Sequence, residues 1–119
     1  MIERHQIEEM FEDMRTNPKA SWSIDDACVW GYFFTDHDEV RLREAAPKLE
    51  QLGYKVVAIG RSEPDDDDPS LFWLQVQRHE KHTVDSLHRR NAELYRLAEE
   101  WGLESYDGMD VGPIEQTEV

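Results

Sequence analysis

Residues 28–35 read Cys-Val-Trp-Gly-Tyr-Phe-Phe-Thr, a run dense in β-branched and aromatic side chains. The run is too short for a typical helix and has the composition of a strand, so we predict a central strand here. Side chains along a strand alternate between the two faces of its sheet. One set is Trp30, Tyr32 and Phe34, and the other is Val29, Gly31 and Phe33.

Apolar residues at helical spacing predict three helices. The first carries a stripe that runs from Ile7 to Met14, and Asn17-Pro18 ends it. The second is capped by Asp36 or Asp38 and ends at Gly53, with a kink expected at Pro47 because proline lacks a backbone donor. The third begins at His82 or Thr83 and ends at Gly102. Its repeats are too few for a coiled coil, so core packing is the better interpretation.

Three further strands are predicted at residues 54–59, 71–76 and 103–111. The segment between the first two of these, residues 60–69, is too polar and too rich in aspartate and proline for a helix or a strand. The two strands that it joins should therefore be neighbours. The last strand should lie at an edge of the sheet, and residues 112–119 form a polar tail that we expect to fray.

The predicted order is helix, then strand-helix-strand-strand-helix-strand. This order is typical of the ferredoxin-like split βαβ arrangement, an α+β fold, here with an extra N-terminal helix. We expect one domain over residues 1–119, with a core at about 28–111 and an added helix at 1–16. The first and third strands should be central, with two helices on one face. The other face needs a cover, and the N-terminal helix is the preferred candidate over a partner.

The formal charge of −14 results from 27 acidic and 13 basic residues. Such a field repels phosphate backbones, so we expect no direct nucleic-acid binding and favour a basic protein partner. The alternative is that the acidity only keeps the protein in solution. Cys28 is the only cysteine, and in its apolar surroundings we expect an inert buried thiol. No secretory signal and no apolar run of about 20 residues is present, so we expect a cytoplasmic protein without a membrane partner.

Two polar clusters invite a catalytic interpretation. His79-Glu80-Lys81-His82 places its histidines at i and i+3, whereas the zinc metalloprotease pattern needs i and i+4, so we expect no metal. Asp36, Asp38 and Glu39 could form an acid/base set, but helix capping and solvation are the simpler roles. We therefore expect no catalytic residues and no cofactor. A small hydrolase or metal enzyme that uses Asp36, His37 and Asp38 remains an alternative.

The predicted topology places two acidic segments at the same end of the sheet. We call this group the acidic pole, and it consists of Asp36, Asp38, Glu39, Glu63, Asp65, Asp66, Asp67 and Asp68. The basic residues Arg78, Lys81, Arg89 and Arg90 should lie toward the other end. A pole of this kind attracts arginine-rich peptides through charge-assisted contacts and speeds their encounter. A solvated loop without a partner and a weak calcium site are the alternatives.

Four segments of the chain resemble the regulator of ribonuclease activity B family. They are Tyr32-Phe-Phe-Thr-Asp36, Leu49-Glu-Gln-Leu-Gly-Tyr54, Leu71-Phe-Trp-Leu74 and Tyr106-Asp-Gly108, although Met109 stands where a Trp is expected. The resemblance implies a ferredoxin-like fold and no catalytic residues. It also implies a non-enzymatic protein that inhibits ribonuclease E by binding its arginine-rich scaffold region. The runner-up is an acidic adaptor or inhibitor of an unrelated basic protein.

Overall fold

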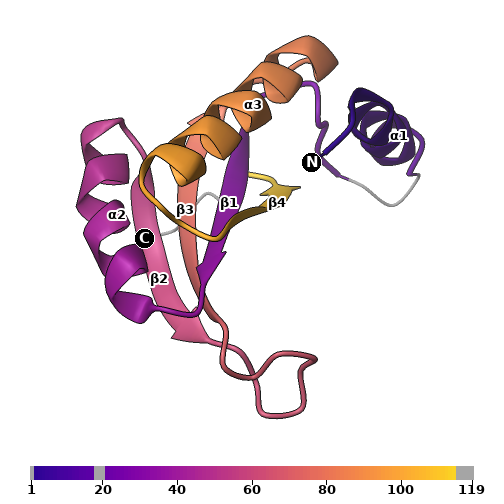
Figure 1. Cartoon of the computed structure of the whole chain (residues 1–119). Helices are drawn as coiled ribbons and strands as arrows, with labels where there is room; N and C mark the ends of the chain where they lie inside the picture. Colours follow the sequence, from indigo (N-terminus) through magenta and orange to yellow (C-terminus); the bar gives the residue numbers. More distant parts are fainter. Residues whose placement is uncertain (1, 18–20, 115–119) are drawn as a thin grey trace, which may run out of the picture.

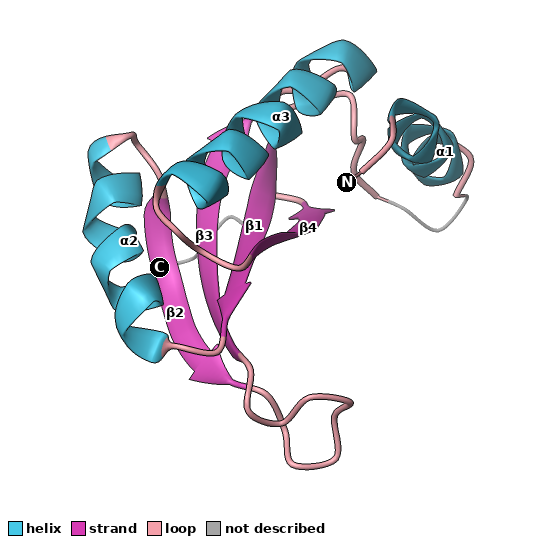
Figure 2. Ribbon diagram, viewed as in Figure 1, coloured by secondary structure: helices cyan, strands magenta, loops and turns pink. Residues whose placement is uncertain are grey.

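The computed structural model describes residues 2–17 and 21–114 and contains a four-stranded antiparallel sheet with the order β2-β3-β1-β4 (Figures 1 and 2). The strands are β1 (Cys28–Asp36), β2 (Lys55–Arg61), β3 (Phe72–Glu80) and β4 (Ser105–Gly112). The helices are α1 (Arg4–Arg15), α2 (Glu39–Gln51) and α3 (Val84–Glu100). The predicted ferredoxin-like α+β arrangement is confirmed, with β1 and β3 in the centre and a helix before the sheet.

The helix boundaries follow local capping chemistry. Asp38, and not Asp36, caps α2 by accepting a hydrogen bond from the backbone nitrogen of Val40. Thr83, and not His82, caps α3 through a reciprocal pair of bonds with Ser86. Helix α2 continues through Pro47 to Gln51, and α1 ends at Arg15, whereas the predicted stop at Pro18 lies outside the described residues, as do residues 115–119 of the predicted tail.

Strand β3 extends to Glu80, four residues beyond its predicted end at Val76. The polar residues Gln75, Gln77 and His79 alternate with inward-facing ones and lie on the face of the sheet that the helices leave open. Polar side chains are compatible with a central strand when one of its faces is solvated. His79 and Glu80 therefore belong to β3, beyond the predicted end of the strand.

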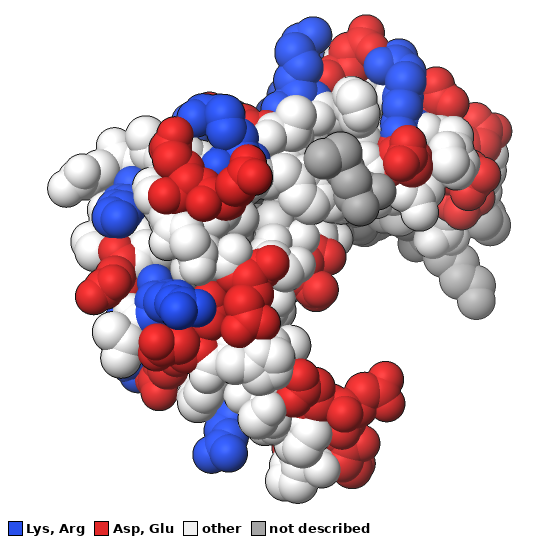
Figure 3. All heavy atoms as spheres, viewed as in Figure 1, with Lys and Arg blue, Asp and Glu red and all other residues white. Residues whose placement is uncertain are grey.

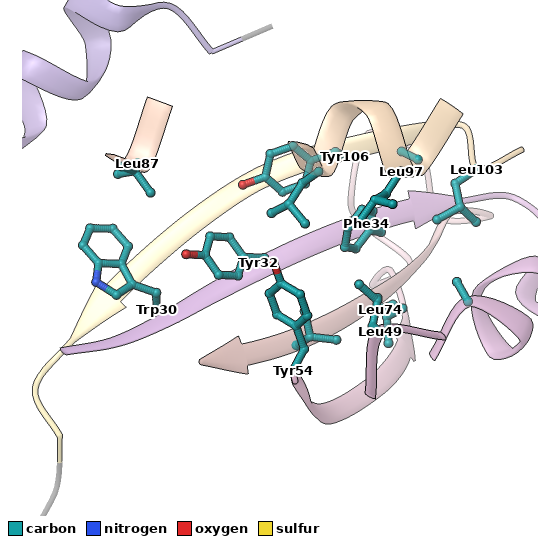
Figure 4. Packing of buried hydrophobic residues seen from close by; sticks show 14 of the residues in the cluster. Trp30, Tyr32, Phe34, Leu49, Tyr54, Leu74, Leu87, Leu97, Leu103 and Tyr106 are labelled. Carbon is teal, nitrogen blue, oxygen red and sulfur yellow. The ribbon is translucent and has the colours of Figure 1, made fainter. Parts of the chain in front are cut away.

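The hydrophobic core lies between the sheet and helices α2 and α3 (Figure 4). Trp30, Tyr32 and Phe34 of β1 are fully buried on this side, together with residues from the neighbouring strands and from both helices. Fully burying a large apolar side chain contributes about 1.5–3 kcal/mol each. The aromatic run of β1 is therefore the main apolar contribution of the sheet to the core. Cys28 is buried as predicted.

Helix α1 packs on the same side of the sheet as α2 and α3, which contradicts the expectation that it covers the opposite face. Its buried residues Ile7 and Phe11 join the common core, and the Phe11 ring stacks on Trp30 at 6.3 Å between centroids. The backbone nitrogen of Ile2 also donates to the hydroxyl of Tyr95 in α3, at 2.8 Å. Phe11 of α1 therefore contributes to the burial of Trp30, whose side chain is fully buried. Within the described residues, no helix covers the other face.

Candidate functional site at the acidic end of the sheet

The antiparallel pairing of β1 with β3 brings the two acidic segments of the sequence to the same end. Asp36, the last residue of β1, lies opposite Phe72, the first residue of β3. The junction between β1 and α2 therefore adjoins the loop of residues 62–71, which projects from the bottom of the molecule in Figure 1. In Figure 3 acidic side chains cover this loop. The structure thus places the predicted acidic residues at one end, as the topology implied.

His37 connects the segments at this end. Its Nε2 atom lies 2.6 Å from Oδ2 of Asp68, and its Nδ1 atom lies 2.8 Å from Oε1 of Glu104. Hydrogen bonds raise the pKa of His37 above its usual value, and the bond to Asp68 has a larger effect than the bond to Glu104. Bonds from Ser70 and His37 lower the pKa of Asp68, and bonds from the backbone and ring of His37 lower the pKa of Glu104. His37 is thus arranged as a cation between two carboxylates.

Sequence reasoning missed Glu104 as a member of this end. It directly precedes β4, and β4 pairs with β1 so that Ser105 lies opposite Thr35. The antiparallel pairing of β1 with an edge strand after α3 was predicted, and it already implied that the residue before that strand lies near His37. The signal was present in the topology, but a single Glu at the end of an acidic helix did not stand out.

Asp36 does not belong to the exposed surface that the sequence predicted. Its side chain is fully buried, and its two oxygens accept hydrogen bonds from the backbone nitrogens of Asp38 at 2.7 Å and Glu104 at 3.1 Å. The guanidinium of Arg41 lies 3.6 Å away. Asp36 therefore ties the end of β1 to the start of β4, which explains why an acid occurs at the end of an aromatic strand. It is not available for direct contact with a partner.

The other predicted acidic residues differ in how far internal contacts occupy them. Asp38 caps α2, Glu39 is paired with Arg43, and Asp66 accepts a bond from the backbone nitrogen of residue 63 at 2.9 Å. Within the described part of the chain, three exposed carboxylates of the loop have neither an ion-pair partner nor a hydrogen-bond donor: Glu63, Asp65 and Asp67. Within this loop, a cation could reach these three carboxylates without displacing an internal contact.

Acidic side chains also cover the outward surface of α1, at the upper right of Figure 3. They include Glu8, Glu9, Glu12 and Asp13. Negative charge is therefore not confined to the pole. At the pole, the bond between His37 and Asp68 ties the loop to the junction after β1, and three other carboxylates of that loop are free among the described residues.

At the opposite end of the sheet, Glu80 is the centre of a polar network. It accepts hydrogen bonds from Tyr32 at 2.9 Å and from Arg90, and it pairs with His82 at 3.1 Å. Burial of Glu80 acts to raise its pKa, but the bonds from His82, Arg90 and Tyr32 outweigh burial and lower the pKa to about 2. The predicted basic end is thus partly neutralised, because Arg90 and also Arg78 are paired with Glu80.

Ser86, His82 and Glu80 form a connected series of hydroxyl, imidazole and carboxylate. The hydroxyl lies 2.9 Å from His82 Nδ1, and His82 Nε2 lies 3.1 Å from Glu80. Hydrolases use this order of groups. Here the same hydroxyl accepts a bond from the backbone nitrogen of Thr83 at 2.8 Å in the cap of α3, and the imidazole also contacts the hydroxyl of Tyr32 at 3.2 Å. The series therefore connects the start of α3 to β1 and β3, and we assign it a structural role.

Two further properties bear on what this chain can bind. Among residues 2–17 and 21–114, no group of three or more His, Cys, Asp or Glu side chains is arranged to hold a metal ion. The helices of the same residues also lack the length and apolar content needed to cross a membrane.

Comparison with known protein families shows to which family the chain belongs. The sequence model of the regulator of ribonuclease activity B family matches residues 4–111, from the start of α1 almost to the end of β4. The chain belongs to the regulator of ribonuclease activity B family. A search of curated proteins found no match. The resemblance predicted from short segments of the sequence is confirmed, and the match also includes α1. Membership in the regulator of ribonuclease activity B family associates the chain with the regulation of ribonuclease activity.

Proposed function

We propose that this chain regulates an endoribonuclease of the ribonuclease E type by protein–protein contact and without catalysis of its own. Its contact surface is the acidic surface, which we define as the acidic pole without Asp36 and with Glu104 added. Its members are Asp38, Glu39, Glu63, Asp65, Asp66, Asp67, Asp68 and Glu104. The partner segment is basic and contains arginine.

The observation that carries this proposal is the set of free carboxylates on the loop between β2 and β3. Glu63, Asp65 and Asp67 are exposed and unpaired among the described residues, while Asp68 of the same loop is held by His37. A fixed loop loses less conformational freedom on binding than a mobile one, so more of the contact energy appears as affinity. Arginine suits such a site because its guanidinium bonds to two carboxylate oxygens at once.

The test compares two double variants with the same change in charge. Asp65→Asn/Asp67→Asn removes two free carboxylates of the loop, and Glu9→Gln/Asp13→Asn removes two exposed carboxylates from α1. Exposed charges of this kind contribute little to folding, so both variants should unfold at the same urea concentration as the wild type within error. Association with the ribonuclease is then measured at low salt, together with cleavage of an RNA substrate.

The loop variant should slow association several-fold, by roughly three- to tenfold, and should change dissociation less, because rim charges act mainly on encounter. The α1 variant should change association much less. Equal slowing by both variants would mean that total charge and not the loop matters. If the wild-type protein neither bound nor inhibited the ribonuclease, this result would contradict the proposed function and would favour a different basic partner.

A further inference from the structure

The face of the sheet that no described helix covers carries a groove with two adjoining parts. One part is lined by Phe33, Trp73 and Asp107, and the other by Gln77, His79 and Asp110. Gln75 of the central strand β3 lines both parts, so the two parts adjoin at this residue. Helix α1 packs on the other side of the sheet, so the fold does not explain the side chains of this face.

Two glycines shape the floor of the groove. A Cβ atom at Gly60 would overlap the indole ring of Trp73, so the ring lies flat against the backbone of β2. A Cβ atom at Gly31 would overlap the carboxylate of Asp110, which therefore lies over the backbone of β1. Glycine at these positions lets an aromatic ring and a carboxylate lie along the sheet. Both groups are thus placed by close packing with the backbone.

A bulge in β4 directs two carboxylates to this face. Phe34 pairs with Tyr106, whereas Phe33 pairs with Gly108, so Asp107 is an extra residue in β4. Side chains of a regular strand would alternate from Tyr106, which faces the core, and Asp110 would then face the core as well. The extra residue reverses the alternation, and Asp110 reaches the open face opposite Gly31. The bulge therefore adds a second carboxylate to the groove.

The groups that line the groove lack the partners that similar groups have elsewhere in the chain. Among the described residues, the carboxylates of Asp107 and Asp110 have no hydrogen bond or ion pair, and no cation lies over the rings of Phe33 and Trp73. Elsewhere, cations lie over other rings, such as Arg61 over Phe72 at 5.7 Å. Ring faces and carboxylates are the two kinds of group that bind a guanidinium.

We propose that this groove binds an extended basic peptide, with one arginine guanidinium over the Trp73 ring and further basic groups paired with Asp107 and Asp110. The inference rests on the proposed function in that the peptide is a segment of the ribonuclease partner. Ser62 and Leu71, which flank the acidic loop, also line the groove next to Trp73. A peptide in the groove therefore continues directly onto the free carboxylates of the loop.

The charge of the groove favours a basic peptide over single-stranded RNA, the other common ligand of an open aromatic sheet face. Single-stranded RNA binds such faces by base stacking, but it needs basic groups along its phosphates. Among the described residues, Lys55 is the only Lys or Arg that lines the groove, and it lies in the part with Asp110, whereas Asp107 lines the part with the aromatic rings. Arginine fits better than lysine, because a planar guanidinium can stack on an indole ring at one position and can pair with both oxygens of a carboxylate at another.

The test uses a six-residue peptide in which arginine alternates with glycine, and a lysine counterpart of the same charge. The chain is labelled with 15N at the tryptophan indoles, and Trp73→Phe identifies the signal of Trp73. The arginine peptide should shift that signal at 0.15 M salt, and the lysine peptide should bind more weakly. Peptide affinity is measured in parallel by fluorescence anisotropy.

Two double variants with the same change in charge then distinguish peptide binding in the groove from peptide binding at the loop. Asp107→Asn/Asp110→Asn should weaken binding of the arginine peptide about tenfold, as expected for the loss of charge-assisted hydrogen bonds. Asp65→Asn/Asp67→Asn should weaken it less and leave the Trp73 shift in place. Both variants should retain the urea midpoint of the wild type, because the changed side chains are exposed.

The inference would be overturned if the arginine peptide left the Trp73 signal unchanged, or if the two peptides bound with equal affinity. It would also be overturned if single-stranded RNA, and not the peptide, shifted the Trp73 signal, or if the signal shifted with protein concentration alone. The last would assign the face to a second copy of the chain. If the ribonuclease is inhibited while Trp73 stays silent, the proposed function stands without the groove. If the ribonuclease is unaffected while the arginine peptide still shifts Trp73, the groove stands and the proposed function fails.

Discussion

The Nε2 atom of His37 lies 2.6 Å from Oδ2 of Asp68 and joins the junction after β1 to the loop between β2 and β3. The other ring nitrogen lies 2.8 Å from Glu104, directly before β4. One exposed imidazole thus holds three segments that are far apart in the sequence. Both nitrogens face carboxylates, so the protonated ring satisfies both contacts at once.

The first prediction concerns the titration of His37. The bonds to Asp68 and Glu104 should keep its pKa above 6.5 in the wild type, and Asp68→Asn should bring the pKa down. Because the folded pKa is the raised one, the stabilisation is complete below the unfolded pKa near 6.5 and is lost as the pH rises through the folded pKa. Heteronuclear NMR of the ring across pH measures the change. Asp67→Asn is the matched control, and an equal effect of both variants would show that only general charge matters.

Replacement of Glu80 by Gln should destabilise the fold by about 1–3 kcal/mol, because Arg90, His82 and Tyr32 lose their charged acceptor. The pKa of Glu80 is lowered from 4.5 to about 2. Its stabilisation is therefore present above pH 4.5 and disappears as the pH falls toward 2. Urea unfolding at neutral and acidic pH should show that the difference between wild type and variant shrinks with acidification. The exposed Glu44→Gln should match the wild type, and a pH-independent difference would argue against the network.

Gly108 has a φ of +145°, a backbone conformation that other residues resist. Among the described residues, and apart from the two chain neighbours, no heavy atom lies within 4 Å of a Cβ atom at Gly108, so Gly108→Ala isolates the backbone cost, which we expect to be about 1–3 kcal/mol. Gly112 has the same free space without a positive φ, so Gly112→Ala should cost less than about 0.5 kcal/mol. Thermal or urea unfolding measures both, and equal losses would locate the strain elsewhere.

Alanine at Gly60 should be less well tolerated than alanine at Gly31. At Gly60 the new methyl group meets the rigid ring of Trp73, and overpacking of this kind costs about 1–3 kcal/mol. At Gly31 it meets the carboxylate end of Asp110, which can rotate away into solvent. Urea unfolding should therefore rank Gly60→Ala as the more destabilised variant. The reverse order would mean that Asp110 is held more firmly than Trp73.

The sequence predicted the arrangement of the fold because strong local signals agreed with each other. The aromatic run of β1 has a single good interpretation, and helix caps and glycines bound the helices on either side of it. The strand order then followed from the handedness of connections. The predicted end of β3 was wrong, because Gln75, Gln77 and His79 lower the hydrophobicity of a strand that is solvated on one face.

The site was predicted less completely, because charge in a sequence does not reveal which carboxylates are already paired. Asp36 and Asp65 look alike in the sequence, yet one is buried under backbone donors and the other is free. The position of α1 was also beyond prediction. Its apolar stripe requires a partner surface, but either face of the sheet offered one, and the sequence did not show that Phe11 stacks on Trp30.

The pairing of β1 with both β3 and β4 has a consequence for how the chain acquires its structure. β1 is the first strand to be synthesised, and its second neighbour, β4, is the last. Contacts between distant parts of a chain form slowly, because a long loop must close first. Until Ser105 to Gly112 have emerged from the ribosome, the aromatic strand has an unpaired edge, and such edges invite aggregation. We therefore expect recovery of native protein to depend on synthesis rate and on chaperones, and most strongly in chains that are truncated before β4.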